Sequence, residues 1–166
     1  MEVPTRHRHI RRNNVARILN NGTWVLVADG EKALFLENEG DAEYPVLKVR
    51  GKETQANPLD REQSTSRPGR QHQSVGSARS AYEETDWHQL EKERFGRHLA
   101  ELLYDHAEQQ NFARIILVAA PEVLAAIRAQ LHQTVTERVV AEIPKTLTNH
   151  PIPEIERVLK AEFDPV

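Results

Sequence analysis

The segment TWVLVADGEKALFLEN, residues 23–38, constrains the fold most, because it places two apolar runs on either side of a tight-turn signal. Both runs are rich in β-branched and aromatic residues, which is typical of buried strands. Asp29 and Gly30 join them, and glycine tolerates the positive φ that the tightest hairpin turns require. We therefore predict an antiparallel hairpin with strands over 23–29 and 32–38.

Three further segments have the composition of strands. Residues 45–50 follow a turn-like acidic patch, and Pro45 suits the first position of a strand. The continuous apolar run over 114–120 is typical of a parallel strand that is covered on both faces. Residues 138–144 form a further apolar run, so five strands are expected in all.

Three helices are predicted around these later strands. Asp86 caps the first, and the helical spacing of its apolar residues defines one buried stripe. Pro121 suits the first turn of a second helix over 121–132, and a third covers 151–163. The stripe of the first helix consists of Phe95, Leu99, Leu102, Leu103 and His106.

These elements predict a single α/β domain in the order βββ-αβαβα. The opening meander implies antiparallel pairing, whereas the strand-helix-strand units imply parallel pairing with right-handed crossovers. We therefore expect one mixed five-stranded sheet with helices on its faces. A chain of 166 residues is the right length for one such domain, which we assign to residues 23–166 behind a flexible basic extension over 1–22.

Composition excludes several classes of function. The chain has no cysteine, which excludes disulfides, thiolate zinc sites and cysteine nucleophiles. Its N-terminus lacks the apolar run of a secretory signal, and no segment has the length of a membrane span, so a cytoplasmic location is expected. The formal charge is −3, divided between +3 over residues 1–82 and −6 over residues 83–166. The basic material is therefore N-terminal.

The chain changes character over residues 52–85, where Gln, Ser, Arg, Asn, Gly and Pro dominate. Such a segment buries too little apolar surface to offset the entropy lost on ordering. A connection of more than 30 residues inside a compact domain is uncommon and is typically functional or disordered. We predict a long, basic, mobile loop here.

Asp29 is the first candidate for catalysis, because it follows the first strand at its carboxyl end, where open α/β sheets place ligand groups. The alternative is that Asp29 and Gly30 serve only the turn. A metal-dependent nuclease would need further carboxylates beside Asp29, and Glu31, Glu37 and Glu122 are the available ones, at spacings that do not demand it.

The other common site chemistries leave no clear pattern. The eight histidines are scattered, and none is spaced from another as zinc ligands are, so no metal site is predicted. His106 lies on the apolar stripe and is interpreted as a hydrogen-bonded core residue. No phosphate-binding glycine loop and no nucleophile-elbow motif occurs, so no cofactor is expected.

The basic residues give a stronger signal for binding. Pro68 fixes its φ and Gly69 lets the chain reverse, so the guanidinium groups of Arg67 and Arg70 are presented at one tip. Arginine-rich stretches of this kind bind phosphates or acidic surfaces, although an idle solvated tail is the alternative for the N-terminal arm. The remaining basic candidates are Arg79, Arg8, Arg11 and Arg12.

The chain resembles the bacterial host-attachment protein family over roughly residues 23–163. The resemblance rests on the strand ending in Val-Ala-Asp, the Arg-Pro-Gly-Arg loop, the apolar strand ending in Ala-Pro, and a terminal Leu-Thr segment with a Pro before the last helix. Members of that family tend to carry an Asp where this chain has Ser66 and Thr146. The resemblance therefore carries no Asp-dependent role to either position.

That family is similar in architecture to the middle domain of class I translation release factors and their Pelota-like relatives. In true release factors the corresponding loop carries Gly-Gly-Gln and positions a water for peptidyl-tRNA hydrolysis. The tip here is Gly69, Arg70 and Gln71. A side chain in place of the second glycine restricts the backbone, which weighs against a catalytic Gln71.

Together these features predict a non-enzymatic cytoplasmic binding module that docks through the loop over 67–70 on RNA, the ribosome or an acidic partner. The alternative is a hydrolase of esters or phosphodiesters, with Asp29 and Gln71 as its suspected catalytic groups. A direct adhesion factor at the cell surface is a third reading, suggested by the family name and opposed by the lack of an export signal. The sequence does not indicate an oligomeric state.

Overall fold

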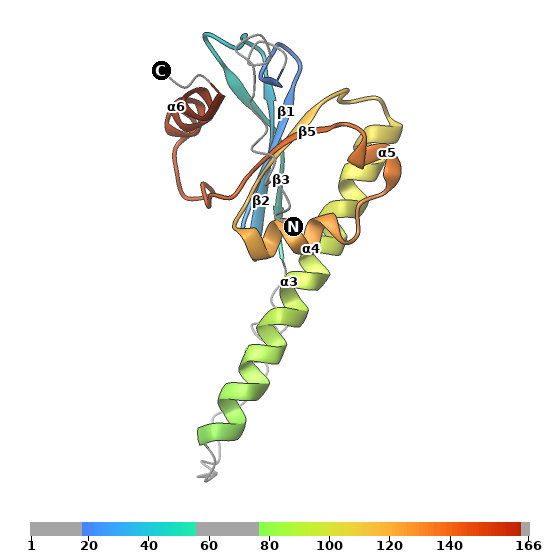
Figure 1. Cartoon of the computed structure of the whole chain (residues 1–166), viewed down its shortest axis with the longest axis vertical. Helices are drawn as coiled ribbons and strands as arrows, with labels where there is room; N and C mark the ends of the chain where they lie inside the picture. The colour runs from blue at the N-terminus through green and yellow to red at the C-terminus, as the bar shows by residue number, and fades with distance from the viewer. Residues whose placement is uncertain (1–17, 56–76, 164–166) are drawn as a thin grey trace, which may run out of the picture.

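The computed structural model describes residues 18–55 and 77–163, and over 77–85 it describes the backbone alone. The described elements form one α/β domain (Figure 1). The strands are β1 (Trp24–Ala28), β2 (Lys32–Asn38), β3 (Leu47–Thr54), β4 (Ile115–Val118) and β5 (Val139–Ile143). The helices are α3 (Ser77–Glu108), α4 (Pro121–Arg128), α5 (Gln133–Thr136) and α6 (Ile152–Phe163).

The five strands form a single mixed sheet in the order β3-β2-β1-β4-β5. The pairs β1·β2 and β2·β3 are antiparallel, and the pairs β1·β4 and β4·β5 are parallel. This arrangement confirms the predicted fold class. β1 and β4 lie in the middle of the sheet, which explains why their side chains are buried along the whole strand.

Helices cover both faces of the sheet, and two apolar cores result (Figure 1). Strand alternation divides the side chains between them, so that Leu26 and Phe35 face α3 and α4, whereas Val27 and Leu36 face α6. We call these the α3 face and the α6 face. No helix within residues 18–55 and 77–163 is long and apolar enough to cross a membrane.

The β1–β2 hairpin occurs where the sequence predicts it, but its turn is built differently. Among the described residues, Gly22 is the one glycine with positive φ, so Gly30 does not adopt the left-handed conformation that we expected. The Asp29 carboxylate closes the turn instead, accepting hydrogen bonds from the backbone N–H groups of Glu31 and Lys32. This is the turn chemistry of aspartate rather than of glycine.

Both ends of the segment predicted as a loop over 52–85 belong to regular elements. β3 continues to Thr54, and α3 begins at Ser77 rather than at an Asp86 cap. The reason is that residues 77–85 contain no Gly or Pro and include two Ala, two Glu and one Arg, which favour continued helix over a start at Asp86. Residues 56–76 lie outside the described part of the chain.

The second half of the domain follows the predicted order, with one added helix. The segment expected as a single helix over 121–132 ends at Arg128, and the short helix α5 follows it. The His132 side chain caps α5 by accepting a hydrogen bond from the Thr134 N–H group. A histidine cap is unusual, so sequence rules for helix starts did not indicate this turn.

The folded domain begins before residue 23. Ile18 and Leu19 fall within the predicted basic extension, yet both are buried in the core of the α6 face. The extension assigned to residues 1–22 is therefore too long by at least these residues. Residues 1–17 lie outside the described part of the chain.

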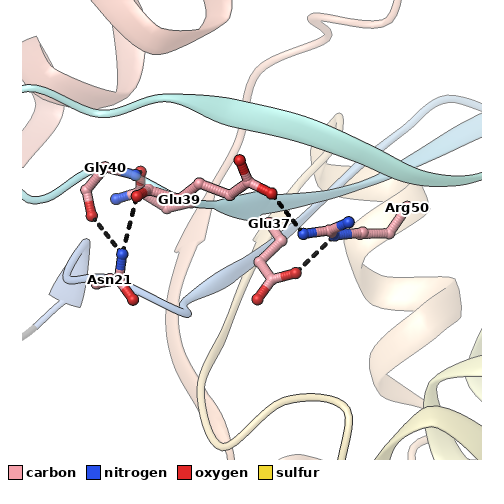
Figure 2. Close-up of polar contacts among 6 residues, drawn as sticks. Asn21, Glu37, Glu39, Gly40 and Arg50 are labelled. Atoms are coloured by element: carbon pink, nitrogen blue, oxygen red, sulfur yellow. Dashed lines mark hydrogen bonds and ion pairs between the residues drawn. The ribbon is translucent and has the colours of Figure 1, made fainter.

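β3 is an edge strand, and a β-bulge interrupts its pairing with β2 at Arg50. Arg50 bonds Glu37 through Nε at 2.6 Å and Glu39 through Nη2 at 2.7 Å (Figure 2). Asn21 holds the turn between β2 and β3 by donating from Nδ2 to the carbonyl oxygens of Glu39 and Gly40, each at 2.9 Å (Figure 2). A bulge and a charged side chain are common protection for a free sheet edge.

Candidate functional site

The connection between β3 and α3 leaves the sheet at Gln55, and this point is held by two elements. The Gln55 N–H group donates to the Glu31 carbonyl oxygen at 2.6 Å in the β1–β2 turn. Its side-chain Nε2 donates to the Glu91 carbonyl oxygen of α3 at 3.0 Å. The connection therefore starts beside Asp29, between the turn and the long helix.

The other end of this connection lies far from its start. Ser77, the first residue of α3, precedes Glu91 by 14 residues, which corresponds to about 21 Å along a helix. Figure 1 shows this end of α3 extending well beyond the sheet. Residues 56–76 have to join two points that far apart, and 21 residues reach about 70 Å when extended. The connection has much more chain than the span requires.

Asp29, the predicted catalytic suspect, is engaged by its surroundings through both carboxylate oxygens. Oδ1 accepts from the Glu31 and Lys32 N–H groups, each at 2.8 Å. Oδ2 accepts from the Thr148 hydroxyl at 2.6 Å, and Thr148 is 8% exposed. These contacts make Asp29 a link between the β1–β2 turn and the segment before α6, which supports the structural interpretation of this residue.

A depression of about 320 Å³ lies between the β1–β2 turn and α3, and we call it the Asp29 pocket. Three of its lining residues are carboxylates and two are basic. Lys92 donates to Glu122 Oε2 at 2.7 Å, and this bond lowers the pKa of Glu122. With Lys92 paired in this way, the pocket is acidic in character and does not suit a phosphate. It is lined by Asp29, Gly30, Glu31, His88, Glu91 and Lys92.

The four carboxylates considered for a metal-dependent nuclease do not come together. Asp29 and Glu31 share the turn, but Glu37 bonds Arg50 at the bulge and Glu122 bonds Lys92. Within residues 18–55 and 77–163, no cluster of three or more His, Asp and Glu side chains could hold a metal ion.

The described histidines take separate structural roles. His106 is hydrogen-bonded to Asn111 at 3.0 Å and packs against Trp24 and Phe35, with ring centroids 5.0 and 5.3 Å apart. The structure confirms that His106 is hydrogen-bonded, but the residue is half-buried and lies at the edge of the core rather than inside it. His98 contacts Glu53 on β3 at 3.1 Å, whereas His132 caps α5.

The structure places few of the predicted binding residues. Arg79 lies in the first turns of α3, where only the backbone is described. Apart from Asp29, the other predicted site residues, catalytic and basic, lie outside the described part of the chain. They are Arg67, Pro68, Gly69, Arg70, Gln71, Arg8, Arg11 and Arg12.

Sequence reasoning missed the residues that surround the start of the connection. Thr148 belongs to the Leu-Thr segment on which the family resemblance rests, but nothing local indicated that its hydroxyl meets Asp29, 119 residues away. Gln55 and Glu91 looked like ordinary polar residues of a loop and a helix surface. Only the tertiary arrangement brings them to one end of the sheet.

The fold is that of an α/β domain with one mixed five-stranded sheet, in which a long connection joins β3 to α3. The chain belongs to the bacterial archaeo-eukaryotic release factor family 12, whose family model matches residues 22–159. That match supports the release-factor side of the predicted resemblance, while the host-attachment family stays a prediction. No curated protein sequence matches the chain.

Proposed function

We propose that this protein is a cytoplasmic binding module that docks on RNA, foremost ribosomal RNA, through the Arg67-Pro68-Gly69-Arg70 segment. Membership of a release-factor family is compatible with a role at the ribosome. The Arg67-Pro68-Gly69-Arg70 segment carries the docking role because its two guanidinium groups form strong, often bidentate bonds with phosphate oxygens.

One observation carries the proposal, namely the placement of the two ends of the connection. Gln55 is anchored at the sheet by the bonds to Glu31 and Glu91, whereas Ser77 lies at the outer end of α3 (Figure 1). Arg67 and Arg70 lie near the middle of the 21 residues between these points. A connection of this length reaches a partner surface that the compact part of the domain does not touch.

The acidic Asp29 pocket supports the same assignment by exclusion. A phosphate backbone is repelled by the carboxylates of Asp29, Glu31 and Glu91, so this pocket is a poor anion site. The basic side chains within residues 56–76 are the better candidates for binding phosphate. We therefore assign the contact with RNA to the connection, whereas the pocket residues Glu31 and Glu91 anchor its first residue, Gln55.

The test is binding of single-stranded RNA and of isolated ribosomes to the wild-type chain and to the double variant Arg67→Ala, Arg70→Ala. Loss of two phosphate contacts to single-stranded RNA lowers the slope of log affinity against log salt by about 1.4. The variant is therefore expected to bind more weakly at 0.1 M salt and to lose less on addition of salt. Fluorescence anisotropy over a salt series measures both quantities.

The matched control is Arg128→Ala, Arg157→Ala, which removes two arginines that are ion-paired with Glu142 and Glu154. It changes the net charge equally, so a general charge effect lowers binding in both double variants. No binding of RNA at low salt contradicts the proposal. Binding of an acidic protein in place of RNA moves the assignment to that class of partner.

Peptidyl-tRNA hydrolysis is the alternative function, because the family carries the name of release factors. Gln71 is its candidate catalytic group, whereas Asp29 is engaged in the turn and with Thr148. Release of the peptide from peptidyl-tRNA by the wild-type chain, lost in Gln71→Ala, would support it. Binding of ribosomes without such release favours the docking module.

A further inference from the structure

Strand alternation sorts the charges at the Asp29 end of β2 and β3 onto opposite faces of the sheet. Lys32 lies on the same side as Leu34 and Leu36, the residues that contact the α6-face core. Lys52 lies directly opposite Leu34 in the register, so it shares that face. Ala33 and its partner Glu53 lie on the α3 face.

Contacts of the neighbouring side chains agree with this sorting. Glu53 bonds His98 of α3 at 3.1 Å, which places its carboxylate on the α3 face. Lys32 Nζ donates to Asn149 Oδ1 at 2.6 Å, in the segment that leads into α6. At this end of β2 and β3, Glu53 thus lies on the α3 face, and the two lysines lie on the α6 face.

Neither ammonium group has a carboxylate within ion-pair distance in the described part of the chain, unlike several other cations nearby. Arg50, a neighbour of Lys52 on β3, is held by Glu37 and Glu39 (Figure 2). Lys92 on the other face is held by Glu122. The carboxylate of the turn, Asp29, is bonded to amides and to Thr148 rather than to Lys32.

The sheet around these lysines is open to solvent. Lys32, Lys52 and Thr54 are exposed, and Val49 on the same face is 39% exposed, so α6 does not cover this corner. Lys32 and Lys52 are diagonal neighbours in the register, since Lys32 pairs with Thr54 and Lys52 with Leu34. Such neighbours lie about 7–8 Å apart, and strand side chains stand away from the sheet.

We propose that Lys32 and Lys52 form a second contact surface for the phosphate backbone of single-stranded RNA, on the α6 face beside the start of the connection. The inference rests on the proposed RNA-binding function and adds to it a contact surface on the strands of the sheet. Gln55 follows this end of β3 directly, so a strand held by Arg67 and Arg70 has these lysines next to the root of the same connection. The acidic α3 face steers the phosphates to the α6 face.

The experiment measures binding of a single-stranded RNA oligonucleotide of about 20 nucleotides over a salt series. Lys32→Gln, Lys52→Gln is expected to lower the slope of log affinity against log salt by about 1.4. At 0.1 M salt this slope difference corresponds to a loss of about 25-fold in affinity. The variant and the wild-type chain are taken to bind equally at 1 M salt, where the counterion contribution vanishes, and 0.1 M is tenfold lower. The variant Lys52→Gln alone is expected to lower the slope by about 0.7.

Lys48→Gln is the matched control, because Lys48 is an exposed lysine of the same strand that lies opposite Glu37 on the other face. It is expected to leave the slope unchanged. Lys52 has no polar partner among the described residues, so the single variant keeps the test valid should loss of the Lys32 bond to Asn149 disturb folding. Thermal unfolding of each variant checks this point.

The outcomes separate the two proposals. If wild-type chain binds RNA and the Lys32, Lys52 variant behaves as Lys48→Gln does, the lysine surface is wrong and the docking segment stands. If the lysine variant weakens binding and Arg67→Ala, Arg70→Ala does not, the docking segment is wrong and the surface stands. If wild-type chain does not bind RNA, both are overturned.

Discussion

At the scale of single residues, Asp29 shows how one carboxylate joins two distant parts of the chain. Its Oδ1 organises the β1–β2 turn, and its Oδ2 accepts from Thr148 of the segment before α6. A hydroxyl that donates to a carboxylate forms a stronger bond than a neutral pair does. The same turn supports Gln55, so this contact sets the base from which the connection to α3 starts.

We expect Thr148→Val to destabilise the domain by about 1.5–3 kcal/mol, because it removes a charge-assisted hydrogen bond at a buried position while keeping the side-chain shape. Urea unfolding measures the change. Thr148→Ser keeps the hydroxyl and is the control, expected to lose less than half as much. A Thr148→Val variant as stable as wild type would show that the bond to Asp29 contributes nothing.

At the scale of elements, the close packing of α3 on α4 depends on Gly96. A Cβ atom at this position would lie 3.0 Å from both the backbone carbonyl carbon and the Cβ of Ala126, and 3.1 Å from the carbonyl oxygen of Ala126. The neighbour is helix backbone, which yields little. Glycine is therefore tolerated inside a long helix here because it lets the two helices approach.

The expected effect of Gly96→Val is a loss of about 1–3 kcal/mol through overpacking, despite the higher helix propensity of valine. Arg97→Val is the control, since Arg97 is the next residue on α3 and is exposed. Surface changes of that kind alter stability by about 0.5 kcal/mol at most. Equal unfolding midpoints for the two variants would rule out the tight contact with α4.

At the scale of the whole molecule, one sheet separates two apolar cores. Ile127 of α4 is buried on the α3 face and Ile155 of α6 on the α6 face. The buried side chains of β1 and β4 point alternately to the two faces of the sheet, so the sheet separates Ile127 from Ile155. Each core is thus packed on its own side of a common layer.

The changes Ile127→Val and Ile155→Val are each expected to cost about 0.5–1.5 kcal/mol, the loss of one buried methylene. Because the sites lie on opposite faces, the double variant should equal the sum within about 0.5 kcal/mol. Equilibrium unfolding of the four proteins tests this. A larger coupling energy would show that the two cores communicate through the sheet.

The elements that the sequence predicts well are those whose signal is local. The β1–β2 hairpin, the apolar run of β4 and Pro121 at the start of α4 each depend on a few neighbouring residues. The predictions that fail depend on competition between local signals, as at Asp86, where a good cap pattern lies inside a continuous run of helix formers. The prediction of a positive φ at Gly30 is wrong because the Asp29 carboxylate closes the turn by accepting backbone hydrogen bonds.

The sequence alone determined the class of fold and most of the core of the sheet, because hydrophobic periodicity reflects burial along strands and helices. The presentation of Arg67 and Arg70 at the tip of the connection stays a prediction from the sequence. Only the tertiary structure decided that Asp29 meets Thr148, that Gln55 anchors the connection, and that Lys32 and Lys52 share a face opposite to Glu53. These contacts join residues far apart in the chain, and they depend on strand register, which no local pattern specifies.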